Sequence, residues 1–275
     1  MRLPELTPDA QWSVCVRDAA TSQVLLEHRA DAVLHTASIG KLFLLVEIAA
    51  LAESGVLDLA EELERTPGDD VADSGIWYLM SRGALAVGDL CWLVGGFSDN
   101  LATNVLMRRI GIAAVTERSR GLGFTHSALL DRVRDDRRPT DPPTLSRGNA
   151  GELSELMARL HRGEVISPAV SAQVLRWVAV NADLSMTAAA FGLDPLAHTE
   201  PDRGLTLVNK TGTTSTVRGD VGLVRGPAGG LAYAVLAGWE DGVDPRDRVL
   251  TDMRRLGDLV REHLTAGPTS PRQSS

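Results

Sequence analysis

A hydroxyl and an amine stand three residues apart at Ser38 and Lys41, at the start of an apolar run. The run predicts a helix over 38–53, on which residues three apart share a face. Free N–H groups at a helix start stabilise a developing anion. A lysine that is partly desolvated beside other cations can lose its proton and act as the base for the serine. Taken alone, the pair is better explained as a serine N-cap followed by a solvent-facing lysine.

A second group of functional side chains, Ser98-Asp99-Asn100, precedes a helix predicted over 101–109. These are typical helix-capping residues, and alone the motif is best explained as a cap. In a catalytic site, the second serine can relay a proton to a leaving nitrogen. The asparagine amide can hold a substrate carbonyl or amide.

A third motif, Lys210-Thr211-Gly212-Thr213, ends a strand predicted over 205–210. Alone, the motif is best explained as a strand that runs into a turn. In a binding site, Gly212 lets a substrate backbone approach an edge strand closely. Lys210 and Thr211 offer a cation and a hydroxyl group to a carboxylate.

The elements that must position these motifs are strands near both chain ends and helices between them. Strands are predicted over 11–17, 23–28, 205–210, 220–224 and 231–239. Further helices are predicted over 86–94, 152–160, 169–180 and 247–264. The last helix has apolar residues spaced for one face that packs on a sheet, namely Val249, Met253, Leu256 and Val260.

The expected fold class is α/β (of the α+β type), with one antiparallel sheet built from both chain ends, flanking helices and an inserted all-helical lobe. The α/β sheet domain is expected to comprise 1–36 and 168–264. The helical domain is expected over 37–167, with an irregular loop at 130–148, and the tail 265–275 is expected to be disordered. A cleft between the two lobes is a natural ligand site.

The composition excludes several classes of protein. The chain has 275 residues, of which 44% are hydrophobic and 23% charged, which suits a globular protein rather than a disordered or collagen-like one. Its formal net charge of −8 and 4% aromatic content argue against nucleic-acid binding and against an anionic membrane surface. We therefore expect a small-molecule substrate as partner, with no nucleic acid and no membrane.

The cysteines and the N-terminal sequence bear on metal binding, on cofactors and on the location of the protein. Cys15 and Cys91 are the two cysteines, without the spacing of a metal site, so no metal and no organic cofactor is expected. The N-terminus lacks the charged, apolar and small-residue pattern of a signal peptide, and the run 42–52 is too short to span a bilayer. A cytoplasmic location is therefore expected.

The three motifs together, SxxK, SDN and KTG in this order, are the signature of penicillin-interacting serine enzymes. The chain thus resembles the class A β-lactamases and their penicillin-binding-protein relatives over about residues 10–264. Ser38 and Ser98 lie 60 residues apart, which is also similar to class A. The resemblance implies a β-lactamase/transpeptidase-like fold.

The resemblance implies a role for each motif residue. Ser38 is the acylated nucleophile and Lys41 is its base. Ser98 passes the proton to the departing nitrogen, and Asn100 contacts the side-chain amide of the substrate. The N–H groups of Ser38 and Thr213 form an oxyanion hole, in which each donor contributes about 3–4 kcal/mol.

The resemblance also implies a side of the site that binds the substrate carboxylate. Lys210, a further catalytic residue, lies there with Thr211, Gly212 and Thr213. Arg218, eight residues after Lys210, matches the arginine with which family members hold the carboxylate. It is equally well explained as a surface arginine on the next strand, and both interpretations stay open.

The irregular loop departs from the family pattern. Class A enzymes carry a glutamate there, shortly after an Asp-Arg pair, that activates water for release of the acyl group. Here Asp131-Arg132 is followed by Arg134 at that position, and an arginine cannot act as a general base at neutral pH. Asp135 or Asp136 could substitute. The interpretation that we prefer is that both are solvated carboxylates paired with arginines of the loop, namely Arg132, Arg137 and Arg138.

Three hypotheses of function follow. The leading one is a class A β-lactamase-like serine hydrolase that acylates Ser38 with a β-lactam or a related cyclic or activated amide, with impaired deacylation. The second is a transacylase or esterase with the same acyl-serine chemistry and another acceptor. The third is a non-hydrolytic penicillin-binding sensor. The intact motif set counts against a pure binder, which has no need of Lys41 or Ser98.

Overall fold

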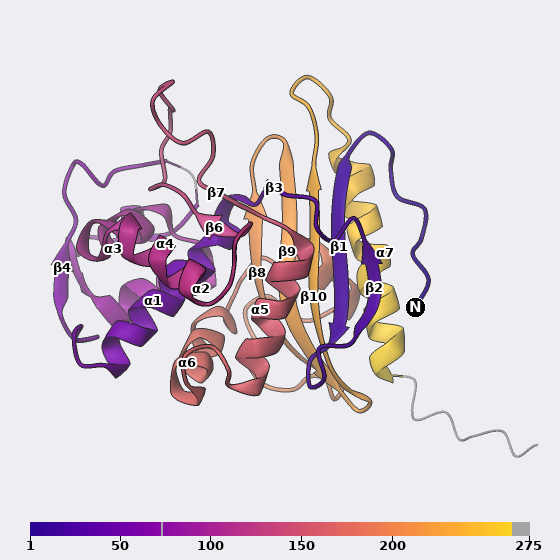
Figure 1. The fold of residues 1–275 in the computed structure, drawn as a ribbon. Helices are drawn as coiled ribbons and strands as arrows, with labels where there is room; N and C mark the ends of the chain where they lie inside the picture. The colour runs from indigo at the N-terminus through magenta and orange to yellow at the C-terminus, as the bar shows by residue number, and fades with distance from the viewer. Residues whose placement is uncertain (73, 266–275) are drawn as a thin grey trace, which may run out of the picture.

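A five-stranded antiparallel sheet in the order β2-β1-β10-β9-β8 forms the centre of the molecule (Figure 1). The structure is a computed structural model that describes residues 1–72 and 74–265. The strands are β1 (Gln11–Asp18), β2 (Val24–His28), β8 (Thr206–Thr213), β9 (Val217–Gly226) and β10 (Gly229–Gly238). The first strand pairs with the last along its whole length, from Gln11 opposite Gly238 to Asp18 opposite Leu231. The predicted sheet built from both chain ends is confirmed.

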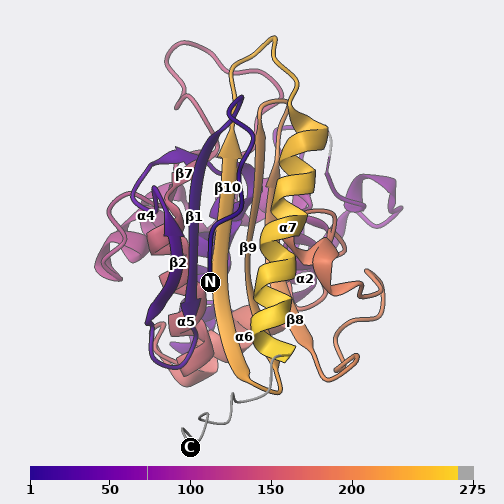
Figure 2. The same cartoon turned by 90° about the vertical axis from the view of Figure 1, so that its right-hand side faces the viewer.

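One face of this sheet is covered by the C-terminal helix α7 (Arg246–Thr265), which runs along the strands in Figure 2. Alternate residues of β1 face it, because successive side chains of a strand point to opposite faces. The predicted apolar stripe of the helix is buried in this layer, at Val249, Met253, Leu256 and Val260. The tail predicted to be disordered, apart from Thr265 at the end of α7, lies outside the described residues.

The other face of the sheet contacts two further helices, and the rest of the α-helices form the helical part beside them (Figure 1). Helix α5 (Ala150–Arg162) lies on β1, β9 and β10, whereas α6 (Pro168–Val178) packs against α1, α2 and α5. Helix α1 (Lys41–Glu53) is apolar on all sides because it passes through the centre of the helical part. The others there are α2 (Val87–Phe97), α3 (Asn100–Ile110) and α4 (Ile112–Gly121). The division of the chain into two units at 167/168 stays a prediction.

Short strands tie the helical part to the site. They are β3 (Leu34–His35), β7 (Ser146–Gly148) and β6 (Ala128–Leu129) in one small sheet, and β4 (Glu62–Glu64) and β5 (Ala84–Ala86) in another. The 3₁₀ helices are η1 (Ala37–Gly40), η2 (Trp77–Leu79) and η3 (Thr187–Phe191). Helix α4 escaped prediction because it buries only Val115 and Ser119, too few for a clear helical period.

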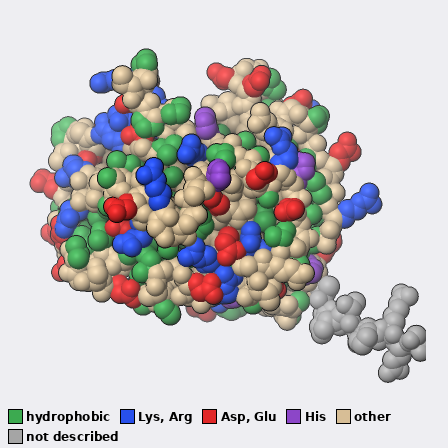
Figure 3. Space-filling view, in the orientation of Figure 1, with side chains coloured by type: hydrophobic (Ala, Val, Ile, Leu, Met, Phe, Trp, Pro, Cys, Tyr) green, Lys and Arg blue, Asp and Glu red, His purple; other side chains and the backbone are tan. Residues whose placement is uncertain are grey.

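Charged side chains of both signs are mixed on the face shown in Figure 3, over both the helical part and the sheet. This face has no continuous basic track of the kind that binds a phosphate backbone. Within residues 1–72 and 74–265, the structure contains no helix that is long and apolar enough to cross a membrane. Where the protein acts stays a prediction.

Candidate active site

Ser38 lies in the 3₁₀ helix η1 and is half-buried at the wall of a cavity of about 310 Å³. Its neighbour Ala37 has a φ of 47°, an unfavourable conformation for a residue with a Cβ. Ser146 of β7 holds this backbone: its Oγ donates to the Ala37 carbonyl (2.5 Å) and lies 2.7 Å from Thr36 Oγ1. A strained backbone that is fixed by its surroundings is typical of functional sites.

Lys41, the first residue of α1, is fully buried, and its Nζ is engaged by three acceptors. It donates to the carbonyl oxygen of Ser98 (2.6 Å), to Ser98 Oγ (3.3 Å) and to Asn100 Oδ1 (2.8 Å). Burial, and then the charge of Lys210, lower the pKa of Lys41 well below its usual value. Among the described residues no hydrogen bond joins this amine to Ser38. Lys41 therefore has the lowered pKa that a base for the serine needs. Its amine contacts Ser98 rather than Ser38.

Ser98 lies between two lysines. Its Oγ accepts hydrogen bonds from Lys41 Nζ and from Lys210 Nζ, the latter at 3.0 Å. The residue ends α2 in the left-handed conformation, with a φ of 53°, so its side chain turns back toward the site. Burial lowers the pKa of Lys210 to about 8, although Asp183 and Asp220 partly counteract it. This bridging hydroxyl is placed to pass a proton along a chain of hydrogen bonds.

The other two residues of the SDN motif hold the site together. Asp99 caps α3 through Ala102 N–H and also accepts from Ile76 N–H and Trp77 N–H, each at 2.8 Å. The capping role predicted from the motif alone is thus present. Asn100 accepts from Lys41 and donates through Nδ2 to the Ala72 carbonyl (2.8 Å). Its contact with a substrate amide stays a prediction.

The KTG strand passes directly over η1. A Cβ on Gly212 would lie 2.2 Å from the Thr36 carbonyl oxygen and 3.2 Å from Ser38 N, so only glycine allows this approach. Thr211 and Thr213 line the cavity with Ser38. The structure therefore brings the ends of the first and third motifs together, although they are far apart in the sequence.

Arg218 is only 8% exposed, which does not fit a surface arginine. Its Nη1 donates to the carbonyls of Thr214 (2.6 Å) and Val217 (2.7 Å), and its guanidinium lies 5.8 Å from the ring centre of Trp239. It pairs with Thr213 across β8 and β9 but is not among the residues that line the cavity. Contact with a substrate carboxylate stays a prediction.

A buried polar network supports the strand that carries Lys210. Asp220 accepts from Asn209 Nδ2 (3.0 Å), Tyr233 Oη (3.1 Å) and Ala188 N–H (2.9 Å), and Asn209 in turn accepts from Asn181 Nδ2 (2.9 Å). Despite these donors, burial raises the pKa of Asp220 to about 6. The network thus holds a carboxylate that is ionised at neutral pH in the interior.

This raised pKa predicts an unusual pH dependence. Because the carboxyl of Asp220 binds its proton more tightly in the folded than in the unfolded chain, its stabilising contribution is complete below about pH 4 and lost as the pH rises through about 6. The free energy of unfolding of the wild type, minus that of Asp220→Asn, should therefore fall by about 2 kcal/mol between about pH 4 and about pH 7. Urea unfolding at several pH values measures it. Asparagine lacks the second carboxylate oxygen that accepts from Ala188 N–H, and this loss is the same at every pH. A difference in the free energy of unfolding that does not change with pH would therefore contradict the prediction.

Two arginines of the irregular loop pair with an aspartate of the same loop. Arg134 donates to Asp131 through Nε (2.7 Å) and Nη2 (3.2 Å), and Arg137 donates to the same carboxylate (2.7 Å). Asp135 accepts from Ala72 N–H (2.9 Å), and no described residue forms an ion pair with it or with Asp136. Both aspartates are exposed, as expected, but the expected pairing with arginines of the loop is wrong. Neither aspartate lines the cavity.

Several residues of the site escaped the motif search. Asn181 and Asp183 follow α6 and line the cavity, as do Ser74 and Phe97 from the helical part. Asn104, on α3, holds the irregular loop through both polar groups of Val133, at 2.8 and 3.1 Å. A polar Asn-Ala-Asp run directly after an apolar helix was the available signal, but short polar runs after helices are too common to predict a site.

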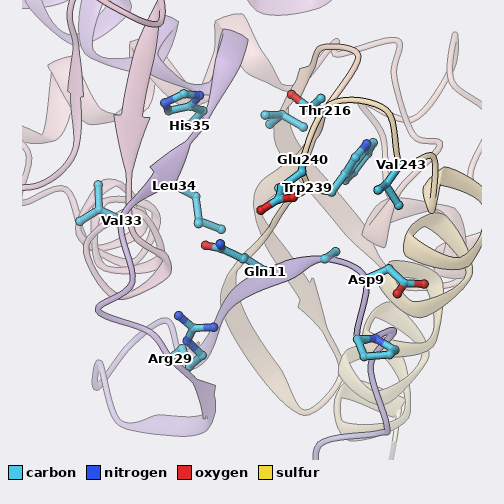
Figure 4. Close-up of a pocket in the computed structure, with 14 residues that line it drawn as sticks. Asp9, Gln11, Arg29, Val33, Leu34, His35, Thr216, Trp239, Glu240 and Val243 are labelled. Carbon is cyan, nitrogen blue, oxygen red and sulfur yellow. The ribbon is translucent and has the colours of Figure 1, made fainter.

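A larger hollow of about 650 Å³ lies beside the β8–β9 turn (Figure 4). Its lining includes His35 from β3, and Trp239 and Glu240, which follow β10. The described residues around it include no serine and no lysine, so they offer no pair that could form an acyl-enzyme. Chemistry rather than size therefore selects the smaller cavity as the candidate active site.

The sheet order and the helices around it match the fold of known beta-lactamases and of PBP-A. Residues 5–264 match the beta-lactamase enzyme family, and the chain belongs to that family. A curated relative is a beta-lactamase of Rhodobacter capsulatus, 26% identical over 249 residues that cover 86% of this chain and 78% of the relative.

Solved structures share the fold. The beta-lactamase from Sphaerobacter thermophilus DSM 20745 has a TM-score of 0.79 at 21% identity and covers 94% of both chains. PBP-A has a TM-score of 0.78 at 22% identity, with 93% of this chain and 90% of that chain covered. A beta lactamase from Burkholderia vietnamiensis has a TM-score of 0.75 at 27% identity, with 94% and 93% covered. The predicted fold class is confirmed.

Proposed function

We propose that the protein is a serine hydrolase of the class A β-lactamase type that forms an acyl-enzyme on Ser38 with a β-lactam or a related cyclic or activated amide. The observation that carries the proposal is the hydroxyl of Ser98, bonded to both Lys41 and Lys210 at the cavity that Ser38 also lines. A pure binding protein has no use for two buried lysines on one serine, whereas amide cleavage needs a proton moved to a leaving nitrogen.

The acylation step follows from these positions. Ser38 Oγ attacks the carbonyl carbon, and neutral Lys41 Nζ takes the hydroxyl proton; burial favours this neutral form. The N–H groups of Ser38 and Thr213 stabilise the oxyanion. As the carbon–nitrogen bond breaks, Ser98 gives its proton to the nitrogen and recovers one from Lys41. The products are an ester on Ser38 and a free amine, and Lys41 is neutral again. The missing bond between Lys41 and Ser38 fits a free enzyme, in which catalytic hydrogen bonds are often long.

Substrate contacts are assigned by the same proposal. Asn100 contacts the side-chain amide, and Thr211, Gly212 and Thr213 form the strand edge along which the substrate lies. Arg218 and Lys210 supply positive charge on the carboxylate side. These assignments are supported by the way β8 packs over η1, which places the strand edge beside Ser38.

We propose that water hydrolyses the acyl-enzyme on Ser38 only slowly. Arg134 stands where the family glutamate is expected and is engaged with Asp131, and neither Asp135 nor Asp136 lines the cavity. The same observation favours a second candidate function, transfer of the acyl group to an amine or alcohol, because an amine in particular attacks an ester with less activation than water needs. Among similar structures, a PBP-A mutant is an acyl-enzyme complex with penicillin G.

The test is intact-protein mass spectrometry over time after mixing with penicillins and cephalosporins, followed by peptide mapping. We expect an adduct on Ser38 that forms and persists, and no adduct on Ser38→Ala. Addition of amines or alcohols that shortens the lifetime of the adduct would support acyl transfer. An adduct that clears rapidly in water alone would contradict the proposed slow release. Labelling that survives in Ser38→Ala, or no adduct with any reagent, would overturn the proposed nucleophile.

A further inference from the structure

Asp183 places a carboxylate in the wall of the cavity, beside Ser98, Thr211 and Thr213. It is the only acidic residue among the described residues of that wall. Nothing in the chemistry of acylation derived above uses it. Its place in the site therefore calls for a separate explanation.

The carboxylate of Asp183 is held firmly. Its Oδ1 accepts from Ser185 N–H (3.1 Å) and from Ser185 Oγ (2.6 Å), and its backbone carbonyl accepts from Asn181 Nδ2 (3.0 Å) and Asn209 Nδ2 (3.3 Å). The half-buried side chain forms no ion pair, and its Oδ2 has no hydrogen-bond partner within the described part of the chain. A fixed negative charge with a free oxygen thus borders the cavity.

This charge acts on the two cations of the same side. Burial lowers the pKa of both Lys210 and Arg218, and Asp183 works against burial in each case. Asp244, from the loop before α7, and Arg246, the first residue of α7, act on the pKa of Arg218 with opposite signs. An anionic substrate group near Lys210 therefore meets positive charge that Asp183 already offsets.

We propose that Asp183 weakens the preference of this site for acyl donors that carry a carboxylate beside the reacting amide. Lys210 and Arg218 attract such a carboxylate, but the fixed charge of Asp183 offsets part of this attraction. Donors with a neutral group in that position do not lose this attraction. The inference rests on the proposed function, since it concerns the acyl donor of Ser38, and it narrows the substrate class.

The experiment compares penicillin G with its uncharged methyl ester. The second-order rate of adduct formation on Ser38 is measured for both reagents with the wild type and with Asp183→Asn, which keeps an oxygen for Ser185. We expect Asp183→Asn to raise the rate with the acid about tenfold and to leave the rate with the ester unchanged. The gain should shrink in about 1 M NaCl, because salt screens partly exposed charges.

Two further variants keep the comparison specific. Asp183→Glu retains the charge and should retain the wild-type preference between acid and ester. Asp58→Asn is a matched control, since Asp58 Oδ1 also accepts from the N–H two residues later, that of Ala60, and does not line the cavity. It should behave as the wild type does.

The outcomes separate this inference from the proposed function. An unchanged ratio of acid to ester in Asp183→Asn, with Ser38 still labelled, would overturn the inference and leave the proposed function standing. A variant in which only the adduct lifetime changes would also overturn it, because Asp183 would then act in release. Failure of the neutral ester and the acid alike to label Ser38 in every variant would overturn the proposed function itself.

Discussion

Replacement of Lys41 by methionine is expected to lower the second-order rate of Ser38 acylation about 10³-fold, within the range of a lost general base. Methionine fills a similar volume in a fully buried position, so the fold should persist. What disappears is the amine that contacts Ser98 and Asn100.

The pH profile makes this prediction specific. In the wild type the rate should rise with pH as Lys41 loses its proton, because only the neutral amine accepts the proton of Ser38. The residual rate of Lys41→Met should lack that rise. Stopped-flow or mass-spectrometric rates, with circular dichroism to check the fold, measure both quantities. A variant that keeps its rate within about tenfold of the wild type would rule out Lys41 as the base.

Replacement of Gly212 by alanine is expected to reduce acylation about 100-fold, the size of effect seen when an oxyanion donor is misplaced. The added Cβ would stand 2.2 Å from the Thr36 carbonyl oxygen, which is backbone and cannot swing away. Strand β8 must then retreat from η1. The N–H groups of Ser38 and Thr213 would be separated, and the predicted oxyanion hole would open.

Gly83→Ala is the matched control for this variant, because nothing lies within 4 Å of a Cβ built there. It should acylate as the wild type does. Gly212→Ala should keep the network around Asp220 and unfold cooperatively, since the clash is local to the contact between β8 and η1. Equal acylation rates in Gly212→Ala and the wild type would show that the close approach has no catalytic role.

Much of the fold was predictable because its pattern is local. Alternation over 11–17 and the apolar stripe of the last helix mark one sheet face each, and β1 and α7 bury those residues. The start of the first helix was less well predicted: α1 begins only at Lys41, and Ser38 lies in a 3₁₀ turn. The cause is tertiary, since Ser146 and the passing β8 strand shape that turn.

The residues of the site were likewise predictable only where a local motif marks them. The three motifs identified the residues that meet at the cavity, including Ser98 with both lysines. They gave no sign of Asp183, which reaches the site through α6 and the contacts of Asn181 and Asn209. Contacts between distant segments bring Asp183 to the cavity, so no local spacing in the sequence marks it. The partners of the loop aspartates were missed for the same reason.

The pairing of β1 with β10 joins residues more than 200 positions apart, such as Gln11 and Gly238. A growing chain therefore releases Ser38, Lys41 and Ser98 from the ribosome long before the strand that carries Lys210 exists. Long-range strand pairing is slow because a large loop must close first, so the sheet is expected to close after the helices have formed. During synthesis the cluster of Lys41, Ser98 and Lys210 is thus completed late, once β8 has been made and has paired.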